Sequence, residues 1–353
     1  PRSLEQRASH DERARLVGDL PEAHGHRARE RPQLIMLMPS LRFTLLVAVC
    51  ILVAPSLSAP APLQAQDTRL NRVIDLLDDH TVVFGIISGD WSLTSARALS
   101  RSGLDFIIID MEHGPWDPET LRIFLLGMTD KQRMAANGNL QMAVTPLVRV
   151  PQNGSEMMSF IVKQALDVGA FGIMFPMVEN REQALNAVTS MRYPRPLSSN
   201  IREPLGRRGR SPGIASWYWG IGGGEYFRVA DVWPLEPAGN LLTIIQVESP
   251  GAVERIEEII TTPGVGVIFI GPSDLGTQMG YGDNPGAPEV ETAIQTVLAA
   301  CLRHDVPCAI TTGAGSVEAR LQQGFRMVTV GGDGGITAGT ARALQLGRGA
   351  AGR

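Results

Sequence analysis

Four short segments of the sequence place charged or polar side chains directly after apolar runs. They are Asp110-Met111-Glu112-His113, Arg149-Val150-Pro151, Gln246-Val247-Glu248 and Gly271-Pro272-Ser273-Asp274. A charged group at the end of a buried strand is costly unless it is paired or bound to a metal. Four such segments in one chain therefore favour a single polar site in which carboxylates, a histidine and an arginine meet.

Two of these carboxylates have the pattern of a metal site. Glu248 and Asp274 follow consecutive apolar runs, so neighbouring strands would bring them to one edge of a sheet. Two carboxylates, with water and substrate oxygens as the other ligands, suit Mg²⁺ or Mn²⁺. A structural zinc site would use cysteines or several histidines instead. The alternative is that each carboxylate caps the next helix, a role that suits Ser249 or Ser273 better.

The histidine and the arginine have the properties of acid–base and anion-binding groups. His113 lies beside two carboxylates, Asp110 and Glu112, and this placement favours an acid–base role. Arg149 keeps its charge and offers a planar fork of donors, which suits a carboxylate or a developing enolate oxygen. The alternative for Arg149 is an ion pair with Asp110 or Glu112, and the two roles are compatible.

Lysine is scarce, and this limits the possible chemistry. Of the 32 basic residues only Lys131 and Lys163 are lysines. A Schiff-base aldolase needs a reactive lysine, normally at a strand end. Lys163 falls inside a predicted helix, and Lys131 falls in a polar connection. Covalent amine catalysis is therefore not expected, and metal-assisted enolisation fits better.

Short apolar runs alternate with helical periods along the chain. The runs are Val82–Ile87, Phe106–Asp110, Val144–Val150, Gly172–Pro176, Leu242–Val247, Val267–Ile270, Pro307–Thr311 and Met327–Val330. Eight strands, each followed by a helix, predict an α/β protein with a single-domain (β/α)8 TIM barrel, whose active site lies at the C-terminal strand ends. An open doubly wound sheet would usually carry a glycine-rich loop after its first strand, which is not found here.

The N-terminal part of the chain differs from the rest. The chain has 353 residues, is 44% hydrophobic and has a formal net charge of -4, so it can bury a large core and does not indicate nucleic-acid binding. Residues 1–37 are interpreted as upstream read-through. Residues 38–66, with Arg42 and the apolar run 43–54, have the pattern of a secretory signal peptide. The alternative is an uncleaved N-terminal anchor, although the run is too short to span a membrane.

Cleavage would leave residues 67–353 as one barrel domain without a stable membrane span. The sequence thus predicts a secreted or periplasmic bacterial protein, or a cytoplasmic one if the signal is misread. Within the domain, the longest stretch without a periodic pattern is Arg192–Asn240, which is rich in aromatic residues. Loops of this length inside a compact domain are usually functional. Because it follows the fourth strand, this one is expected to lie over the top of the barrel.

The motifs resemble those of the HpcH/HpaI aldolase family. These are metal-dependent, class II 2-oxo acid aldolases of the phosphoenolpyruvate/pyruvate-binding barrel superfamily. The likeness extends from about Val82 to about Leu346 and rests on IIIDMEHGPW, PLVRVP, GIMFPMVEN, RYP…RRG, QVESPGAVERI, GVIFIGPSDLGTQMGYGDNP and TVGGD. It implies reversible cleavage of a 4-hydroxy-2-oxo acid to pyruvate and an aldehyde through a metal-stabilised pyruvate enolate. It also implies Mg²⁺, Mn²⁺ or Co²⁺ as the cofactor.

The resemblance assigns the main roles residue by residue. Glu248 and Asp274 would bind the cation. Arg149 would steady the enolate oxygen. His113 would position or activate a water for proton transfer, and Asp110 would orient His113 or bind that water.

The resemblance also implies supporting roles. Gln246 would support the metal shell. Backbone N–H groups of the turn that contains Gly271 and Ser273 would hold the substrate carboxylate. Arg208 corresponds approximately to a loop arginine of the family and is expected to bind substrate. Asp167 matches a family position that partners the histidine, which would need a neighbouring subunit here; its alternative is an ordinary place in the last turn of a helix.

This sequence departs from the family pattern in two connections, Arg195–Leu205 and Thr129–Ala143, which are longer than usual. The aldehyde half of the pocket is therefore less clearly implied than the metal and pyruvate half. Two other functions stay open: a citryl- or malyl-CoA-type lyase, and a non-catalytic extracytoplasmic protein that captures an oxo acid. Because family members commonly form hexamers, the resemblance also implies a homo-oligomer.

Overall fold

The computed structural model describes residues 69–353, apart from 153, 155, 283, 333 and 334. The predicted read-through (1–37) and signal peptide (38–66) lie outside the described residues, and both stay predictions. Of the helices in the described part, none combines the length and the apolar character needed to cross a membrane.

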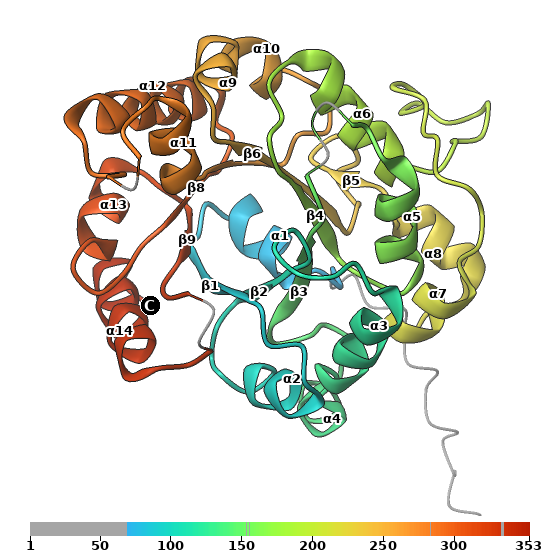
Figure 1. The fold of residues 1–353 in the computed structure, drawn as a ribbon. Helices are drawn as coiled ribbons and strands as arrows, with labels where there is room; N and C mark the ends of the chain where they lie inside the picture. The colour runs from blue at the N-terminus through green and yellow to red at the C-terminus, as the bar shows by residue number, and fades with distance from the viewer. Residues whose placement is uncertain (1–68, 153, 155, 283, 333–334) are drawn as a thin grey trace, which may run out of the picture. The chain divides into compact units, whose positions relative to one another are not determined.

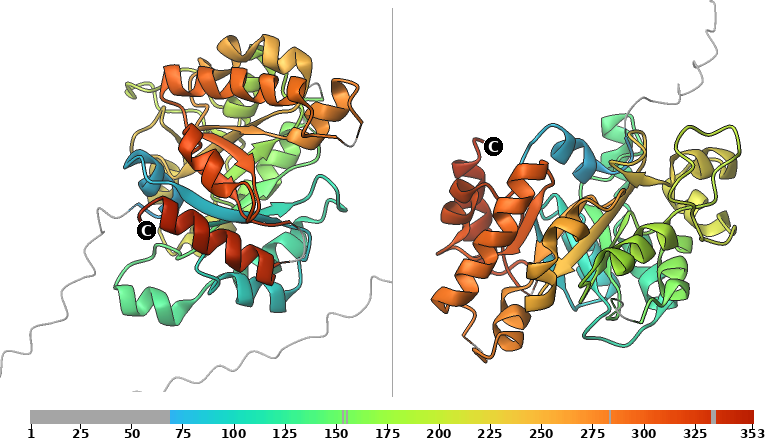
Figure 2. Two further views of the ribbon diagram at one scale, coloured as in Figure 1. Left: turned by 90° about the vertical axis from the view of Figure 1, so that its left-hand side faces the viewer. Right: turned by 90° about the horizontal axis from the view of Figure 1, so that it is seen from above.

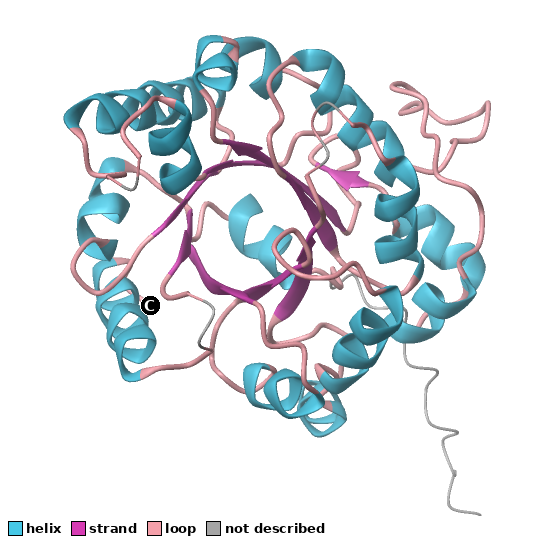
Figure 3. Ribbon diagram, in the orientation of Figure 1, coloured by secondary structure: helices cyan, strands magenta, loops and turns pink. Residues whose placement is uncertain are grey.

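Parallel strands close into a barrel, which Figure 1 shows from one end and Figure 3 shows as a ring of strands inside a layer of helices. The eight strands of the ring are β1 (Val83–Ser88), β2 (Phe106–Asp110), β3 (Thr145–Arg149), β4 (Gly172–Phe175), β6 (Leu241–Val247), β7 (Val267–Ile270), β8 (Cys308–Thr311) and β9 (Met327–Thr329). Pairing of β4 with β6 closes the ring. The predicted (β/α)8 barrel is confirmed, and no predicted strand end is wrong by more than one residue.

Helices pack around the outside of the ring, as the two side views in Figure 2 show. They are α2 (Leu93–Leu99), α3 (Pro118–Gly127), α4 (Lys131–Asn137), α5 (Ser159–Asp167), α6 (Arg181–Met191), α7 (Gly213–Trp219), α8 (Gly223–Val229), α9 (Pro250–Glu254), α10 (Ile256–Ile260), α11 (Pro272–Gln278), α12 (Pro288–His304), α13 (Val317–Gln323) and α14 (Ala338–Ala350). In α12, proline opens the first turn and Arg303 and His304 close the last, which suits the helix dipole.

The core lies on both faces of the strands. All five residues of β2 are buried, and so are all seven of β6. Parallel strands that are buried on both faces have continuous apolar sequences, and for this reason their positions can be predicted from the sequence. Close packing inside the ring also demands small residues: a Cβ at Gly85 would lie 2.3 Å from the ring of Phe106.

A helix that the sequence patterns do not reveal, α1 (Arg72–Asp78), closes the N-terminal end of the barrel. It is visible through the ring of strands in Figures 1 and 3. The Asn71 amide donates to the carbonyl oxygens of Phe171 and Asn240, just before β4 and β6. Arg72 forms an ion pair of 2.7 Å with Asp105, which precedes β2. The mouth that remains open is therefore the C-terminal one.

The stretch Arg192–Asn240 differs from its prediction in two ways. It contains α7, α8 and a short strand, β5 (Val232–Trp233), which pairs with the start of β6. It also packs at the N-terminal end of the barrel rather than over the top, since Trp219 donates its indole N–H to the Gly169 carbonyl at 2.8 Å. The reason is that α6 returns the chain to this end before the stretch begins.

A buried ion pair anchors this stretch. Arg192 exposes none of its surface, and its Nε and Nη2 atoms donate to the two oxygens of Asp231 at 2.6 and 2.9 Å. Arg195 reaches the same carboxylate at 2.9 Å. Taking charges out of water is tolerable only when they are paired in this way.

We expect Asp231→Ala to lower the free energy of unfolding by about 3–5 kcal/mol, because it leaves a buried guanidinium without its partner. Urea denaturation measures the change. The control is Glu236→Ala, which removes a more exposed carboxylate from Arg195 and should cost about 1 kcal/mol or less. Equal losses for the two variants would contradict the role given to Asp231.

Candidate active site

The predicted catalytic and metal-binding residues meet at the C-terminal end of the barrel. Asp110 and Arg149 are the last residues of β2 and β3 and are partners in the strand register. Gln246 lies near the end of β6, and Glu248 follows that strand directly. Gly271 follows β7 in the same way. In this fold, side chains at these strand ends surround the mouth of the barrel.

The centre of the cluster is a buried ion pair between Asp110 and Arg149. The Nε and Nη2 atoms of Arg149 donate to the two carboxylate oxygens of Asp110 at 2.9 and 2.6 Å. The two residues are only 5% and 7% exposed. Burial acts to lower the pKa of Arg149, but the hydrogen bonds and charge of Asp110, with nearby carboxylates, raise it above its usual value. The guanidinium is therefore charged and fixed in orientation.

Glu112 joins this pair to the histidine. Its Oε2 atom lies 3.0 Å from Nη1 of Arg149 and 3.6 Å from Nε2 of His113. Burial raises the pKa of Glu112 and outweighs the lowering effect of Arg149 and His113. The sequence analysis gives Glu112 as an alternative ion-pair partner of Arg149 and places it beside His113, and both neighbours are observed.

His113 lies at the rim, with 63% of its side chain exposed. Its loop packs closely against the indole ring of Trp91, since a Cβ at Gly114 would lie 2.6 Å from that ring. The expected contact from Asp110 is not seen among the described residues: the oxygens of Asp110 accept from Arg149 and from the Glu112 backbone N–H. Within this subunit Glu112, not Asp110, is the carboxylate beside His113.

Glu248 is the most deeply buried acid of the cluster, with 2% of the residue exposed. Its Oε1 atom accepts the backbone N–H of Met177 at 2.9 Å, and its Oε2 atom accepts a short bond from the Gln246 amide. Burial, helped by the nearby charges of Glu112 and Asp274, outweighs the lowering effect of the two donors and raises the pKa of Glu248 to about 7. The site thus contains a carboxyl group that is costly to ionise.

Met177 supplies an N–H from a strained backbone. Its φ of 55° lies in the left-handed region, which residues other than glycine rarely adopt. The turn that follows β4 therefore holds a conformation that points this N–H at Glu248. Such strain often accompanies functional sites. The family motif GIMFPMVEN contains Met177, but no spacing rule in the sequence reveals its contact.

The surroundings of Glu248 fit a divalent cation. The Oε1 atom of Gln246 is buried without a hydrogen-bond partner among the described residues. A Cβ at Gly271 would lie 2.6 Å from Oε2 of Glu248, so only glycine lets the backbone of this turn pack so closely against the carboxylate. The described residues hold no group of three or more metal-ligating side chains. A cation held here would therefore take most of its ligands from water and substrate oxygens.

The other carboxylate of the predicted metal site, Asp274, lies in the first turn of α11 and is solvent-exposed. Its charge raises the pKa of both Glu112 and Glu248, so it lies close to them. In the turn before it, the Gly271 N–H donates to the Val247 carbonyl, and a proline follows. The N–H groups left for a substrate carboxylate are therefore those of Ser273 and Asp274, a narrower set than the sequence predicts.

Helix capping by Glu248 is not observed. Ser249 is the N-cap of α9, and its hydroxyl accepts the backbone N–H of Ala252 at 3.2 Å. The same hydroxyl donates to Glu179 at 2.6 Å. Ser249 thus caps the helix, and the oxygens of Glu248 accept instead from Met177 and Gln246.

Two predicted residues, Arg208 and Asp167, are brought together, but at the opposite end of the barrel. Asp167 is the last residue of α5 and accepts from Arg208 at 2.9 Å and from Lys163 at 2.9 Å. Arg208 is 2% exposed, lies over the ring of Tyr193 and donates to Tyr226. This placement does not support a substrate-binding role for Arg208 within one chain. It also separates Asp167 from the histidine of its own subunit.

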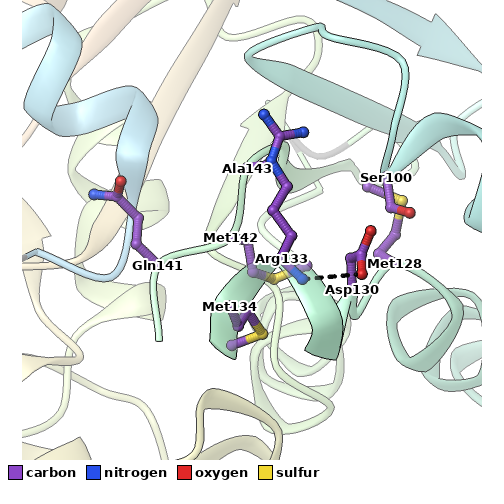
Figure 4. Close-up of a pocket in the computed structure, with 8 residues that line it drawn as sticks. All are labelled: Ser100, Met128, Asp130, Arg133, Met134, Gln141, Met142 and Ala143. Carbon is purple, nitrogen blue, oxygen red and sulfur yellow. Dashed lines mark hydrogen bonds between the residues drawn. The ribbon is translucent and has the colours of Figure 1, made fainter. Parts of the chain in front are cut away.

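Two hollows border the described barrel. One, drawn in Figure 4, is lined by Ser100, Met128, Asp130, Arg133, Met134, Gln141, Met142 and Ala143. It lies at the N-terminal end, where Asp130 caps α4. The other, of about 340 Å³, lies at the C-terminal ends of β8 and β9 and includes Gly313, Gly331 and Thr340. Only the second shares an end of the barrel with the carboxylates.

Known proteins are similar to this chain over most of its length. A model of the HpcH/HpaI aldolase/citrate lyase family matches residues 90–339. A 5-keto-4-deoxy-D-glucarate aldolase of Salmonella arizonae is 34% identical over 253 residues, which covers 70% of this chain and 86% of the relative. A 5-keto-4-deoxy-D-glucarate aldolase of Escherichia fergusonii is 32% identical over 267 residues, which covers 75% of this chain and 92% of the relative. A crystal structure of an HpcH/HpaI aldolase/citrate lyase family protein from Burkholderia cenocepacia matches with a TM-score of 0.62 and 31% identity, covering 74% and 93%.

The pKa of Glu248 predicts a pH dependence of stability. In the metal-free folded chain the carboxyl group keeps its proton up to about pH 7, whereas in the unfolded chain it loses the proton near its ordinary pKa of 4.5. Its stabilising contribution is therefore complete below pH 4.5 and is lost as the pH rises to 7. We expect Glu248→Gln to remove a slope of up to about 1.4 kcal/mol per pH unit. Urea denaturation in EDTA measures this, and equal slopes for wild type and variant would contradict it.

Proposed function

Because this chain belongs to the HpcH/HpaI aldolase/citrate lyase family and is a metal-dependent class II aldolase, we propose that it cleaves a 4-hydroxy-2-oxo acid reversibly to pyruvate and an aldehyde. The names of its relatives favour sugar-derived dicarboxylic acids as the substrate class. One observation carries the proposal. The guanidinium of Arg149 is fixed by Asp110, and the charge of the buried Glu248 helps to raise its pKa.

In this proposal Glu248 and Asp274 hold the divalent cation, for which Mg²⁺, Mn²⁺ and Co²⁺ are the candidates. When bound, such an ion polarises the 2-oxo group of the substrate as a Lewis acid. Burial supports the role of Glu248, since a positive charge beside it would offset the cost of ionising it. The buried Oε1 atom of Gln246, which has no hydrogen-bond partner among the described residues, supports it as well.

Arg149 donates to the oxygen that gains negative charge when the bond between C3 and C4 breaks. Asp110 fixes the guanidinium before the substrate arrives, so little reorganisation is needed during the reaction. His113 takes the proton of the 4-hydroxyl group as the aldehyde forms. The same imidazolium returns a proton to C3 of the enolate, which balances the reaction. The exposure of His113 at the rim supports this role, because the aldehyde half must enter and leave there.

We expect the purified protein to release pyruvate from 4-hydroxy-2-oxo acids with Mg²⁺, Mn²⁺ or Co²⁺ and to lose this activity in EDTA. Glu248→Ala should lower kcat/KM by about 100-fold or more. A matched control is Glu258→Ala on the surface of α10, which should leave the activity unchanged. Coupled lactate dehydrogenase measures the pyruvate.

Three outcomes would decide against the proposal. Activity that survives EDTA, or that survives Glu248→Ala, would exclude the metal mechanism. Metal-dependent binding of pyruvate without deuterium exchange at its methyl group would indicate a binding protein instead. A requirement for a CoA thioester would indicate a citryl- or malyl-CoA-type lyase.

We also propose that the protein forms a homo-oligomer. Helices α2, α3 and α5 pack side by side, and four of their large apolar side chains are 40–57% exposed: Leu93, Ile123, Leu126 and Phe160. Apolar residues exposed on neighbouring helices are typical of a surface that another subunit covers. A second copy of the same chain is the commonest partner for such a surface.

Sedimentation velocity at micromolar concentration should therefore show a species larger than the monomer. Ile123→Glu combined with Leu126→Glu should shift it to a smaller species, because a charge in a buried contact is costly. Leu302→Glu is the control, since Leu302 is 57% exposed but lies on α12. A monomeric wild type would disprove the proposal.

A further inference from the structure

The turns that follow β4 and β6 are joined through side chains, just as the two strands are joined through their backbones. In the turn after β4, the Met177 N–H donates to Oε1 of Glu248 at 2.9 Å. Later in the same connection, Oε1 of Glu179 accepts the hydroxyl of Ser249 at 2.6 Å. Ser249 follows Glu248 directly. The two turns are therefore bonded twice, once at the candidate metal ligand and once at the residue after it.

Glu179 is also bonded to the helices outside the ring. Its backbone N–H donates to the side chain of Gln183 in α6 at 2.7 Å. Its carbonyl oxygen accepts from Nε of Arg255, the residue between α9 and α10, at 2.7 Å. Glu179 is thus held at α6 and at the junction of α9 and α10, while its carboxylate faces Ser249.

Helix capping does not explain the carboxylate of Glu179. The N-cap of α6 is Asn180, whose side chain accepts the Gln183 N–H. The N-cap of α9 is Ser249, whose hydroxyl oxygen accepts the Ala252 N–H. Both helix ends therefore have their caps without Glu179, and the bond from the Ser249 hydroxyl to Glu179 is an additional contact between the two turns.

The turn after β4 needs support because its backbone is strained at Met177. A φ of 55° lies in the left-handed region, which costs energy for a residue with a side chain. On one side the turn packs against Gly154, where a Cβ would lie 1.7 Å from the Met177 carbonyl oxygen. On the other side Glu179 ties the chain to Ser249. Without that tie the turn can relax, and the Met177 N–H then moves away from Glu248.

The Met177 N–H is one of two donors that orient Glu248. The other is the Gln246 amide, which donates to Oε2. Groups that hydrogen-bond a metal ligand fix its orientation before the ion arrives, and their loss weakens metal binding. A residue that keeps the Met177 N–H in place therefore acts on the cation through Glu248.

We propose that Glu179 is a positioning residue that raises the affinity of the site for its divalent cation, by holding the Met177 turn against Glu248. This inference rests on the proposed metal-dependent function and adds to it a residue outside the cluster of carboxylates at the mouth. The contact that matters is the hydrogen bond from Ser249, so an uncharged acceptor at position 179 is sufficient.

The first test measures the binding of Mn²⁺ alone, followed by the electron paramagnetic resonance signal of the free ion. We expect Glu179→Ala to raise the Kd for Mn²⁺ about 10-fold, because it removes the acceptor for Ser249. Glu179→Gln keeps an acceptor oxygen and should stay within about 3-fold of wild type. The control is Glu182→Ala, which removes an exposed acid from the first turn of α6 and should match wild type.

The second test needs neither metal nor substrate. Hydrogen–deuterium exchange in EDTA, read by mass spectrometry on the peptide that contains Met177, reports how firmly its N–H is bonded. We expect exchange in this peptide to be about 10-fold faster in Glu179→Ala than in wild type. Glu179→Gln and Glu182→Ala should exchange at the wild-type rate.

The outcomes separate this inference from the proposed function. If wild type binds no Mn²⁺, the proposed metal-dependent function fails and this inference falls with it. If wild type binds Mn²⁺ and Glu179→Ala binds it equally well, the positioning role alone is wrong. The role is also wrong if Glu179→Gln loses as much affinity as Glu179→Ala, or if exchange at Met177 is unchanged. Should Glu179→Ala lower the melting temperature, Glu179→Met replaces it, because methionine keeps the bulk of the side chain without the acceptor.

Discussion

The ion pair between Asp110 and Arg149 is the contact on which the geometry of the site depends. It exists because β2 and β3 end in register, so that two charged residues face each other at the mouth of the barrel. Each charge is buried, and each would be costly alone. The pair fixes the guanidinium, and the guanidinium in turn fixes Glu112, the neighbour of His113. Strand register thus determines which groups lie beside the exposed imidazole.

A second constraint is the excess of negative charge at the mouth. Three carboxylates, those of Asp110, Glu112 and Glu248, act on the guanidinium of Arg149, and the charge of a fourth, Asp274, acts on Glu112 and Glu248. Glu248 is the least hydrated of them, and the left-handed turn at Met177 is strained to reach it. At neutral pH neither feature favours the fold, since ionising a buried acid is costly and a strained turn reduces stability. They are explained if the barrel is built to receive a positive charge.

The fold could be predicted from the sequence because parallel strands buried on both faces leave continuous apolar runs. Because each apolar run marks where a strand ends, the sequence also predicted the positions of Asp110, Arg149 and Glu248 at those ends. The prediction failed where long-range packing decides. Helices α1, α7 and α8 are seven residues long each and show little periodicity. Burial of Arg208 beneath Tyr193 depends on a stretch whose position no local pattern gives. Adjacency alone does not tell toward which neighbour Glu112 turns.

The chain that the sequence patterns did not explain gathers at one end. Helices α1, α4, α7 and α8 all lie where the strands begin, opposite the carboxylates. This arrangement separates these helices from the candidate site. A change in one of them alters the closed end and the outer surface, while the register of β2 and β3, which positions Asp110 and Arg149, stays untouched. Such a barrel can therefore vary the surface at its closed end without altering the geometry of the site at the other end.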